Sequence, residues 1–99
     1  MNEKKKTCPE WIGEKFMGEP VAVLCMRYWY RGRLAEVGED FIVLTEAKAV
    51  EETGPASQAE PNQEDPIPSD ILIKTMAIEL ICQPAWVWHG FTKGKKEKK

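Results

Sequence analysis

A single glycine, Gly32, interrupts the longest β-type segment of this chain. Branched and aromatic residues dominate the sequence from Val21 to Val50, and Gly38 with its acidic neighbours marks a turn within this region. A glycine inside a strand indicates a sharp bend, a bulge or the close approach of another backbone. We therefore expect the middle strand of three to bend at Gly32, with strands at about 21–28, 30–37 and 41–47.

A short helix is predicted ahead of these strands. Thr7 and Glu10 have the spacing of a capping box, and Pro9 stands in the first turn. Apolar residues then recur at helical spacing as far as Gly18. The pattern predicts a helix over about 8–17. Because a helix of about ten residues is not stable alone in water, we expect it to dock on the rest of the chain as a lid or brace.

The size and composition of the chain favour one small globular domain. It has 99 residues, of which 42% are hydrophobic and 30% charged, an ordinary mixture that argues against wholesale disorder. No apolar run reaches the roughly 18 to 20 residues that a membrane span needs, and no signal-peptide segment follows the N-terminus. We expect a soluble, cytoplasmic protein with no membrane partner.

Charge is unevenly distributed around a net value of −2. Residues 1–6 carry three Lys against one Glu, and residues 93–99 carry five Lys against one Glu. Between them stand six basic and fourteen acidic residues, so the body of the chain is near −8. This distribution divides the chain into a basic tail (1–7), one domain (8–92) and a Lys-rich tail (93–99). An acidic domain is not expected to bind nucleic acid through general electrostatic attraction, because such binding depends on cations placed against the phosphates.

An acidic, proline-rich segment separates the first strands from the last ones. Residues 51–70 contain four prolines, six acidic residues and no basic residue, which predicts a loop that is mobile or becomes ordered on a partner. Two short strands are expected after it, joined by a tight turn near Thr75 and stopped at Pro84. The chain then continues through Trp86 and Trp88 as a short extension with a solvated end.

The order of these elements, together with two motifs, resembles the Sm and Hfq family. Residues 30–34 followed by 37–44 are similar to the family's first motif, and residues 74–81 with Pro84 beyond are similar to the second. The resemblance implies a mostly β fold, in which an N-terminal helix precedes a five-stranded, strongly bent antiparallel small barrel. It also implies a homo-oligomeric ring, with six or seven subunits as the family's habit.

The base-binding positions of the family are altered in this chain. Gly38 and Ile42 stand where Sm proteins usually have an Asp and the Asn that faces the base. Lys74 begins Lys-Thr-Met, where the family has Arg-Gly-Asn, Arg-Gly-Asp or Tyr-Lys-His. Because RNA bases are recognised by stacking and by hydrogen bonds to their edges, we expect the uridine pocket to be absent and Lys74 to remain as a cationic contact.

The last two predicted strands favour self-assembly. Residues 71–74 and 77–82 are apolar on both faces, which a sheet with one face in water does not tolerate. Pairing of these edges with further copies by a repeated rotation would close a ring. The expected interface consists of Ile71, Leu72, Ile73, Ala77, Ile78, Leu80, Ile81, Trp86 and Trp88.

Residues for catalysis or metal binding are scarce. His89 is the only histidine, and both serines, Ser57 and Ser69, lie in the acidic segment, so no nucleophile with a paired base can be assembled. The three cysteines form no Cys-x-x-Cys pair. Cys25 and Cys82 could be neighbours on the first and last strands, and packing as small apolar groups explains them better than an improvised metal site. We expect no enzyme activity, metal or cofactor.

A cluster of aromatic and basic residues leaves two functions open. Such residues stack on single-stranded nucleic acid, and they also anchor protein interfaces. The first function is a ring that binds single-stranded RNA through this cluster and the lysine tail, with an altered base pocket. The second is an adaptor ring that presents its tryptophans and acidic segment to a protein partner, and the acidic body favours an interface role for the cluster. The candidate RNA-binding residues are Arg27, Tyr28, Trp29, Tyr30, Arg31, Arg33 and Lys74.

Overall fold

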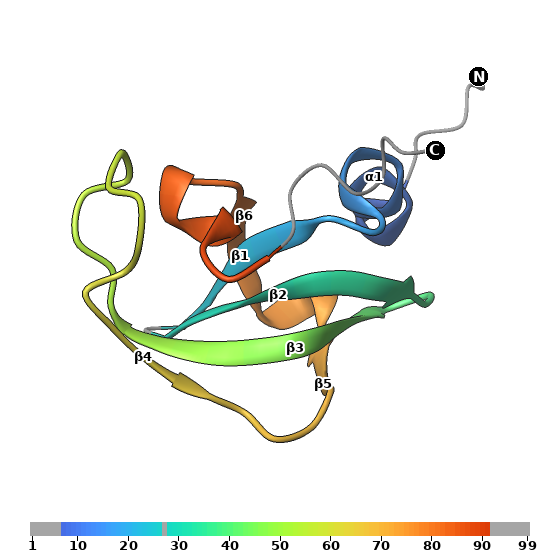
Figure 1. Cartoon of the computed structure of the whole chain (residues 1–99). Coiled ribbons are helices and arrows are strands. Elements are labelled where there is room, and N and C mark those ends of the chain that lie inside the picture. The colour runs from blue at the N-terminus through green and yellow to red at the C-terminus, as the bar shows by residue number, and fades with distance from the viewer. Residues whose placement is uncertain (1–6, 27, 92–99) are drawn as a thin grey trace, which may run out of the picture.

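The computed structural model describes residues 7–26 and 28–91, which form one helix, six strands and two 3-10 helices (Figure 1). The candidate residue Arg27 and the lysine tail lie outside the described residues. In chain order the elements are α1 (Cys8–Phe16), β1 (Pro20–Cys25), β2 (Tyr28–Val37), β3 (Phe41–Glu52), β4 (Gln63–Pro66), β5 (Ile71–Lys74), η1 (Thr75–Ala77), β6 (Ile78–Cys82) and η2 (Ala85–Trp88).

The predicted helix is confirmed, including its cap. The Thr7 hydroxyl accepts a hydrogen bond from the Glu10 backbone N–H, and the Glu10 carboxylate accepts one from the Thr7 backbone N–H. These two bonds satisfy donors that a helix start otherwise leaves unpaired. Ile12 is buried against the sheet, so the helix acts as the expected brace.

All strand pairs are antiparallel, and they form one sheet in the order β4-β3-β2-β1-β6. β5 lies off this path and pairs with the first residues of β3, while β4 pairs with the last ones. The mostly β fold and the pairing of the first strand with the last are confirmed. The predicted closed barrel is not formed. β5 pairs with β3, the chain then turns through η1, and β6 pairs with β1, so β5 and β6 do not join the two ends of the sheet (Figure 1).

The structure is irregular at Gly32, where the sequence indicated a bend, a bulge or a close approach of another backbone. The pairing of β2 with β3 shifts register between Arg31 and Arg33. A Cβ atom at Gly32 would lie 2.9 Å from the Thr45 carbonyl oxygen and 3.2 Å from the Ala47 Cα. Only a residue without a side chain allows the two backbones to approach this closely.

The acidic segment 51–70 is more ordered than its composition predicts. β3 continues five residues past its expected end, to Glu52, and β4 pairs with this extension. The register pairs Val50 with Glu64 and Ala49 with Asp65. The expectation of a simple loop is therefore wrong for this part of the segment. Composition alone does not show that the folded sheet offers β3 as an edge with which residues 63–66 can pair.

The sheet is covered on both faces. One core lies beneath α1 and contains Val21, Val23 and Leu34. The second lies on the other face, where η2 packs Trp86 and Val87 against the sheet. Successive residues of a strand point to opposite faces, so β1 contributes Val21 and Val23 to one core and Ala22 to the other. Both faces of β1 are apolar because both are covered. The short extension expected here is instead a 3-10 helix over 85–88, packed on the sheet by the buried Trp86.

Candidate functional site

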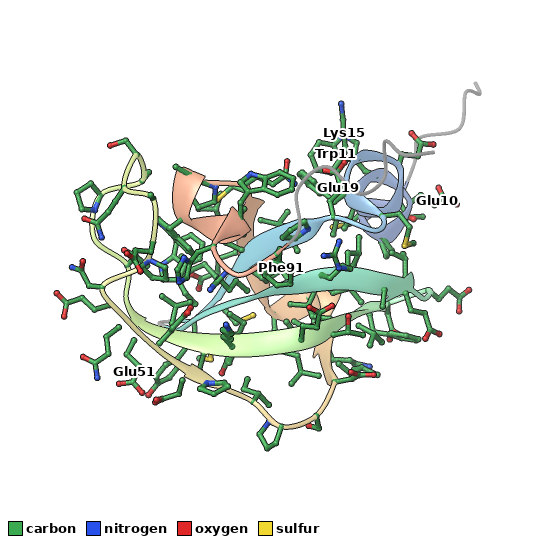
Figure 2. All side chains as sticks on the ribbon, in the orientation of Figure 1. Glu10, Trp11, Lys15, Glu19, Glu51 and Phe91 are labelled. Atoms are coloured by element: carbon green, nitrogen blue, oxygen red, sulfur yellow. The ribbon has the colours of Figure 1, made fainter. Side chains whose placement is uncertain are left out.

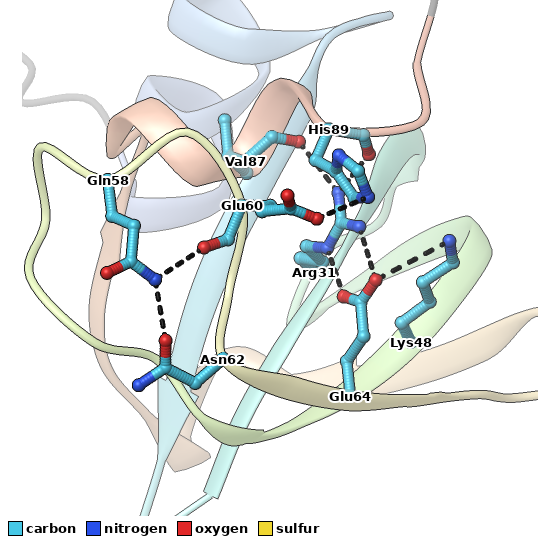
Figure 3. A network of polar contacts seen from close by, with 8 residues as sticks. All are labelled: Arg31, Lys48, Gln58, Glu60, Asn62, Glu64, Val87 and His89. Carbon is cyan, nitrogen blue, oxygen red and sulfur yellow. Dashed lines mark hydrogen bonds and ion pairs between the residues drawn. The ribbon is translucent and has the colours of Figure 1, made fainter.

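Arg31 is the centre of a polar network on the η2 face of the sheet (Figure 3). Its side chain is fully buried and donates to both carboxylate oxygens of Glu64, Nε to Oε1 at 2.7 Å and a terminal nitrogen to Oε2 at 2.8 Å. The other terminal nitrogen donates to the carbonyl oxygens of Val87 at 3.1 Å and His89 at 2.6 Å. One guanidinium thus joins β2, β4 and the segment after β6, which are far apart in the sequence.

Glu64 is the acidic partner of this network. Burial raises the pKa of its carboxyl, but the hydrogen bonds and charge of Arg31, with smaller contributions from Lys48 and His89, outweigh that effect and hold the pKa below its ordinary value. Lys48 Nζ lies 3.8 Å from Glu64, and the His89 ring lies 3.5 Å from the Glu60 carboxylate. Glu64 therefore stays ionised, as a buried guanidinium requires.

The surrounding loop carries its own hydrogen bonds. The Gln58 side chain donates to the Glu60 carbonyl oxygen and to the Asn62 side chain, both at 2.7 Å (Figure 3). The Ala85 backbone N–H donates to the Ala56 carbonyl oxygen at 2.9 Å. The acidic segment is thereby attached to η2 as well as to β3.

Two of the predicted RNA-binding side chains, Arg31 and Arg33, form their hydrogen bonds within the protein. Arg31 is buried and is not presented to solvent. Arg33 donates to the Gly18 carbonyl oxygen at 2.9 Å, and its guanidinium lies 5.2 Å from the centre of the Phe91 ring. Lys74 is exposed and forms a 3.0 Å ion pair with Asp40. Arginines satisfied within the chain have little capacity left for phosphate.

The three remaining candidates, Tyr28, Trp29 and Tyr30, are consecutive in β2, so Trp29 lies on the face of the second core and Tyr30 on the face of the first. With residues of β3 they line a groove of about 610 Å³ at the end of the sheet. Trp29 is half-buried and meets Trp86 edge to face, with ring centres 5.8 Å apart. Tyr28 has 66% of its surface exposed. The lining residues are Tyr28, Trp29, Tyr30, Ala49, Val50, Glu51 and Thr53.

Glu51 is the charged residue among those lining this groove. The neighbouring Asp65 carboxyl raises the pKa of the Glu51 carboxyl, first through hydrogen bonding and then through its negative charge. Figure 2 shows Glu51 at the sheet edge beside β4, remote from α1. The two acidic side chains are close because β4 adds to β3 at this point.

The two positions at which the sequence resemblance would place base contacts, Gly38 and Ile42, are closed. Ile42 is fully buried in the first core, and a side chain at Gly38 would collide with the Phe41 ring. Neither position offers an amide or a carboxylate to a ligand.

The predicted interface residues divide into exposed and interior groups. Leu72 and Leu80 are exposed, as are Ala77 and the neighbouring Met76, which was not predicted and is 88% exposed. Ile73 and Trp86 are buried within the protomer, so neither is available at its surface. The remaining four are partly buried and pack against the two cores: Ile71, Ile78, Ile81 and Trp88.

The cysteines and His89 show no catalytic arrangement. Burial raises the pKa of the Cys25 and Cys82 thiols, and Glu79 adds to this at Cys25, so both stay protonated. Within residues 7–26 and 28–91 no three His, Cys, Asp or Glu side chains are grouped as a metal site. No helix in this part of the chain is long and apolar enough to cross a membrane.

Two residues central to these surfaces, Glu64 and Glu51, were missed by the sequence reasoning. Both stand among prolines and other acids, where no local pattern distinguishes a buried carboxylate from a solvated one. The one signal that could have indicated an acidic partner is strand alternation, which places Arg31 on the same face of β2 as the apolar Trp29. No family model matches the chain, and no curated protein matches its sequence.

Proposed function

We propose that this protein is a non-catalytic, Sm-like module that assembles with copies of itself and serves as an adaptor for a protein partner. The observation that carries the proposal is the exposure of large apolar side chains, Leu72, Met76 and Leu80, along β5, η1 and β6. Among the described residues, β5 and β6 each pair on one side only. A strand edge with exposed apolar residues is a template for pairing with another chain.

The strand arrangement supports the Sm-like part of the proposal. The pairing of β2 with β3 shifts register at Gly32, β1 pairs with β6, and a short 3-10 turn connects β5 to β6. With β5 and β6 diverging, the open edge of β5 in one copy can accept β6 of the next copy. Repeated by rotation, this contact closes a ring and covers the open edges of β5 and β6.

The adaptor part of the proposal rests on the contacts of the basic side chains. Arg31, Arg33 and Lys74 all contact acceptors of their own chain, and the body of the sequence is near −8. These features favour a protein partner over a polyanion.

Light scattering coupled to size-exclusion chromatography tests the assembly. We expect the wild type to have a multiple of the 11.3 kDa chain mass over a hundredfold dilution, and Leu80→Lys to be a monomer with an unchanged circular dichroism spectrum. Met17→Lys is the matched control, because Met17 is equally exposed and lies outside β5 and β6. A wild-type monomer, or equal disruption by both variants, would contradict the proposal.

RNA binding is the second candidate, favoured by Lys74, because its ion pair with Asp40 is exposed to solvent and a phosphate could compete for the ammonium group. Fluorescence anisotropy with short U-rich and A-rich oligonucleotides at two salt concentrations tests it. We expect Lys74→Ala to weaken binding more than Lys15→Ala, which removes an exposed lysine from α1. No binding at low salt, or equal losses in the two variants, would reject this candidate.

A further inference from the structure

β4 forms one edge of the sheet and is held there by backbone pairing and polar side chains. It is the last strand in the order β4-β3-β2-β1-β6, and among the described residues it pairs only with the end of β3 (Figure 1). Gln63, Asp65 and Pro66 are exposed, and in the described part of the chain no β4 side chain belongs to either core. Elements with few buried apolar contacts are those that open most easily in a folded protein.

The carboxylate site that Glu64 fills is formed by groups outside β4. Arg31 also donates to the carbonyl oxygens of Val87 and His89, and these bonds hold the guanidinium on the face of β2 (Figure 3). Its Nε and second terminal nitrogen are left directed at the position of the Glu64 carboxylate. Lys48 Nζ lies 3.8 Å from the same carboxylate. A guanidinium fixed in this way is a preformed site for a planar carboxylate.

The adjoining edge of β3 provides backbone pairing at the same place. The register sets Glu64 opposite Val50 and Pro66 opposite Lys48, so one short strand uses both the β3 edge and the Arg31 site. An extended segment with a carboxylate at the position opposite Val50 presents the same groups. Strand addition of this kind draws affinity from main-chain bonds and specificity from side-chain positions.

We propose that β4 covers a strand-acceptor site, and that an extended segment of a partner polypeptide carrying one carboxylate replaces it. The partner's backbone would pair with residues 48–52, and its carboxylate would take the two guanidinium bonds that Glu64 makes. Pro61 is buried and Ile67 packs on the first core, so β4 would leave the edge as a short loop between these anchored ends. The inference rests on the adaptor part of the proposed function, for which it names the partner class, and does not require self-assembly.

The test uses the full-length chain and a fluorescent peptide of residues 62–68, followed by anisotropy. In the peptide, Asp65→Asn leaves one carboxylate. We expect the Glu64→Ala chain to bind it about tenfold more tightly than the wild type does, because loss of the Arg31 contact raises the fraction of chains whose site is open. Glu60→Ala is the matched control, since it removes a carboxylate of the same segment that is paired with His89, and it should bind as the wild type does.

Two further measurements locate the binding. Ala49 and Asp65 are register partners, and the Cα separation of such a pair suits a disulfide. In a Cys8→Ser background, the Glu64→Ala chain with Ala49→Cys and Asp65→Cys should not bind the peptide when oxidised, and reduction should restore binding. In the wild type, the amides that join β4 to β3 should exchange hydrogen at least about tenfold faster than those that join β1 to β2, which keeps the inference testable if Glu64→Ala does not fold.

Four outcomes would overturn the inference. Equal binding of a peptide that also carries Glu64→Gln would show that the carboxylate is not recognised. Equal binding to the oxidised chain would place the peptide at another site. Equal binding to the wild type and to Glu64→Ala, or equal exchange of the two sets of amides, would show that β4 is not displaced. If the peptide binds neither chain while light scattering still reports an oligomer, the acceptor site is rejected and self-assembly stands.

Discussion

The Arg31 guanidinium and the Glu64 carboxylate form a two-bond ion pair, at 2.7 and 2.8 Å, that attaches β4 to the face of β2. The residues are 33 positions apart, and the pair is buried on the arginine side. A buried guanidinium without its carboxylate would be costly, because desolvation of the charge is then uncompensated. The acidic segment is thus part of the folded structure.

We expect Glu64→Ala to lower the free energy of unfolding by about 3 kcal/mol, since it leaves Arg31 buried without its counter-charge. Glu60→Ala should cost less than about 1 kcal/mol, because the Glu60–His89 pair is exposed. Urea denaturation at neutral pH measures both variants. Equal losses would show that the contact with Arg31 contributes little.

The same pair predicts a dependence on acid. Because the pKa of Glu64 is lower in the folded chain than its ordinary value of 4.5, the unfolded chain takes up its proton first as the pH falls. The stabilisation is therefore complete above about pH 4.5 and is lost as the pH falls through the folded pKa. We expect the stability difference between wild type and Glu64→Gln to shrink below about pH 4.5 in urea titrations. A difference that grows in acid would contradict the assigned direction.

Two glycine substitutions should act in opposite directions. Gly32→Ala places a Cβ against the backbone of Thr45 and Ala47, and we expect a loss of about 1–3 kcal/mol. Gly13→Ala lies inside α1, where its Cβ would be 3.5 Å from Val37, and should gain about 0.5–1 kcal/mol from helix propensity. Thermal unfolding followed by circular dichroism compares them. A neutral Gly32→Ala would mean that β2 and β3 separate easily there.

The second core should depend on Trp86. Trp86 is 2% exposed, and its replacement by Ala should cost about 3–5 kcal/mol through the cavity left behind. Trp11→Ala removes the same side chain from a site that is 45% exposed and should cost about 1 kcal/mol or less. Urea denaturation of the two variants gives the comparison. Similar losses would show that η2 does not hold a core.

The cysteines should differ in reactivity. Cys8 is exposed, whereas burial raises the pKa of Cys25 and Cys82 and keeps them as thiols. With a thiol-specific chromogenic disulfide at pH 8, we expect one fast equivalent and two slow ones, and Cys8→Ser should remove the fast phase. A fast phase that persists in Cys8→Ser would contradict the burial of the other two.

Local sequence determined the elements whose partners are near in the chain. The capping box of Thr7 and Glu10 closes within one helical turn. The branched strands follow from hydrophobic pattern and turn residues. These parts of the fold were predicted because they depend on neighbouring residues. At Gly32 the sequence marked an irregular position, but the backbone that approaches it, at Thr45 and Ala47, is brought there by the fold.

Tertiary structure decided what the polar and aromatic residues do. The sequence suggested a surface cation at Arg31, but its side chain is buried because β4, η2 and His89 bring four acceptors to it from 33 to 58 residues away. Trp86 is buried for a similar reason, since the sheet face that covers it forms only when β1 and β3 are assembled. Sequence alone specifies which groups need partners, and the fold specifies which partners they reach, because contact between distant residues depends on chain topology.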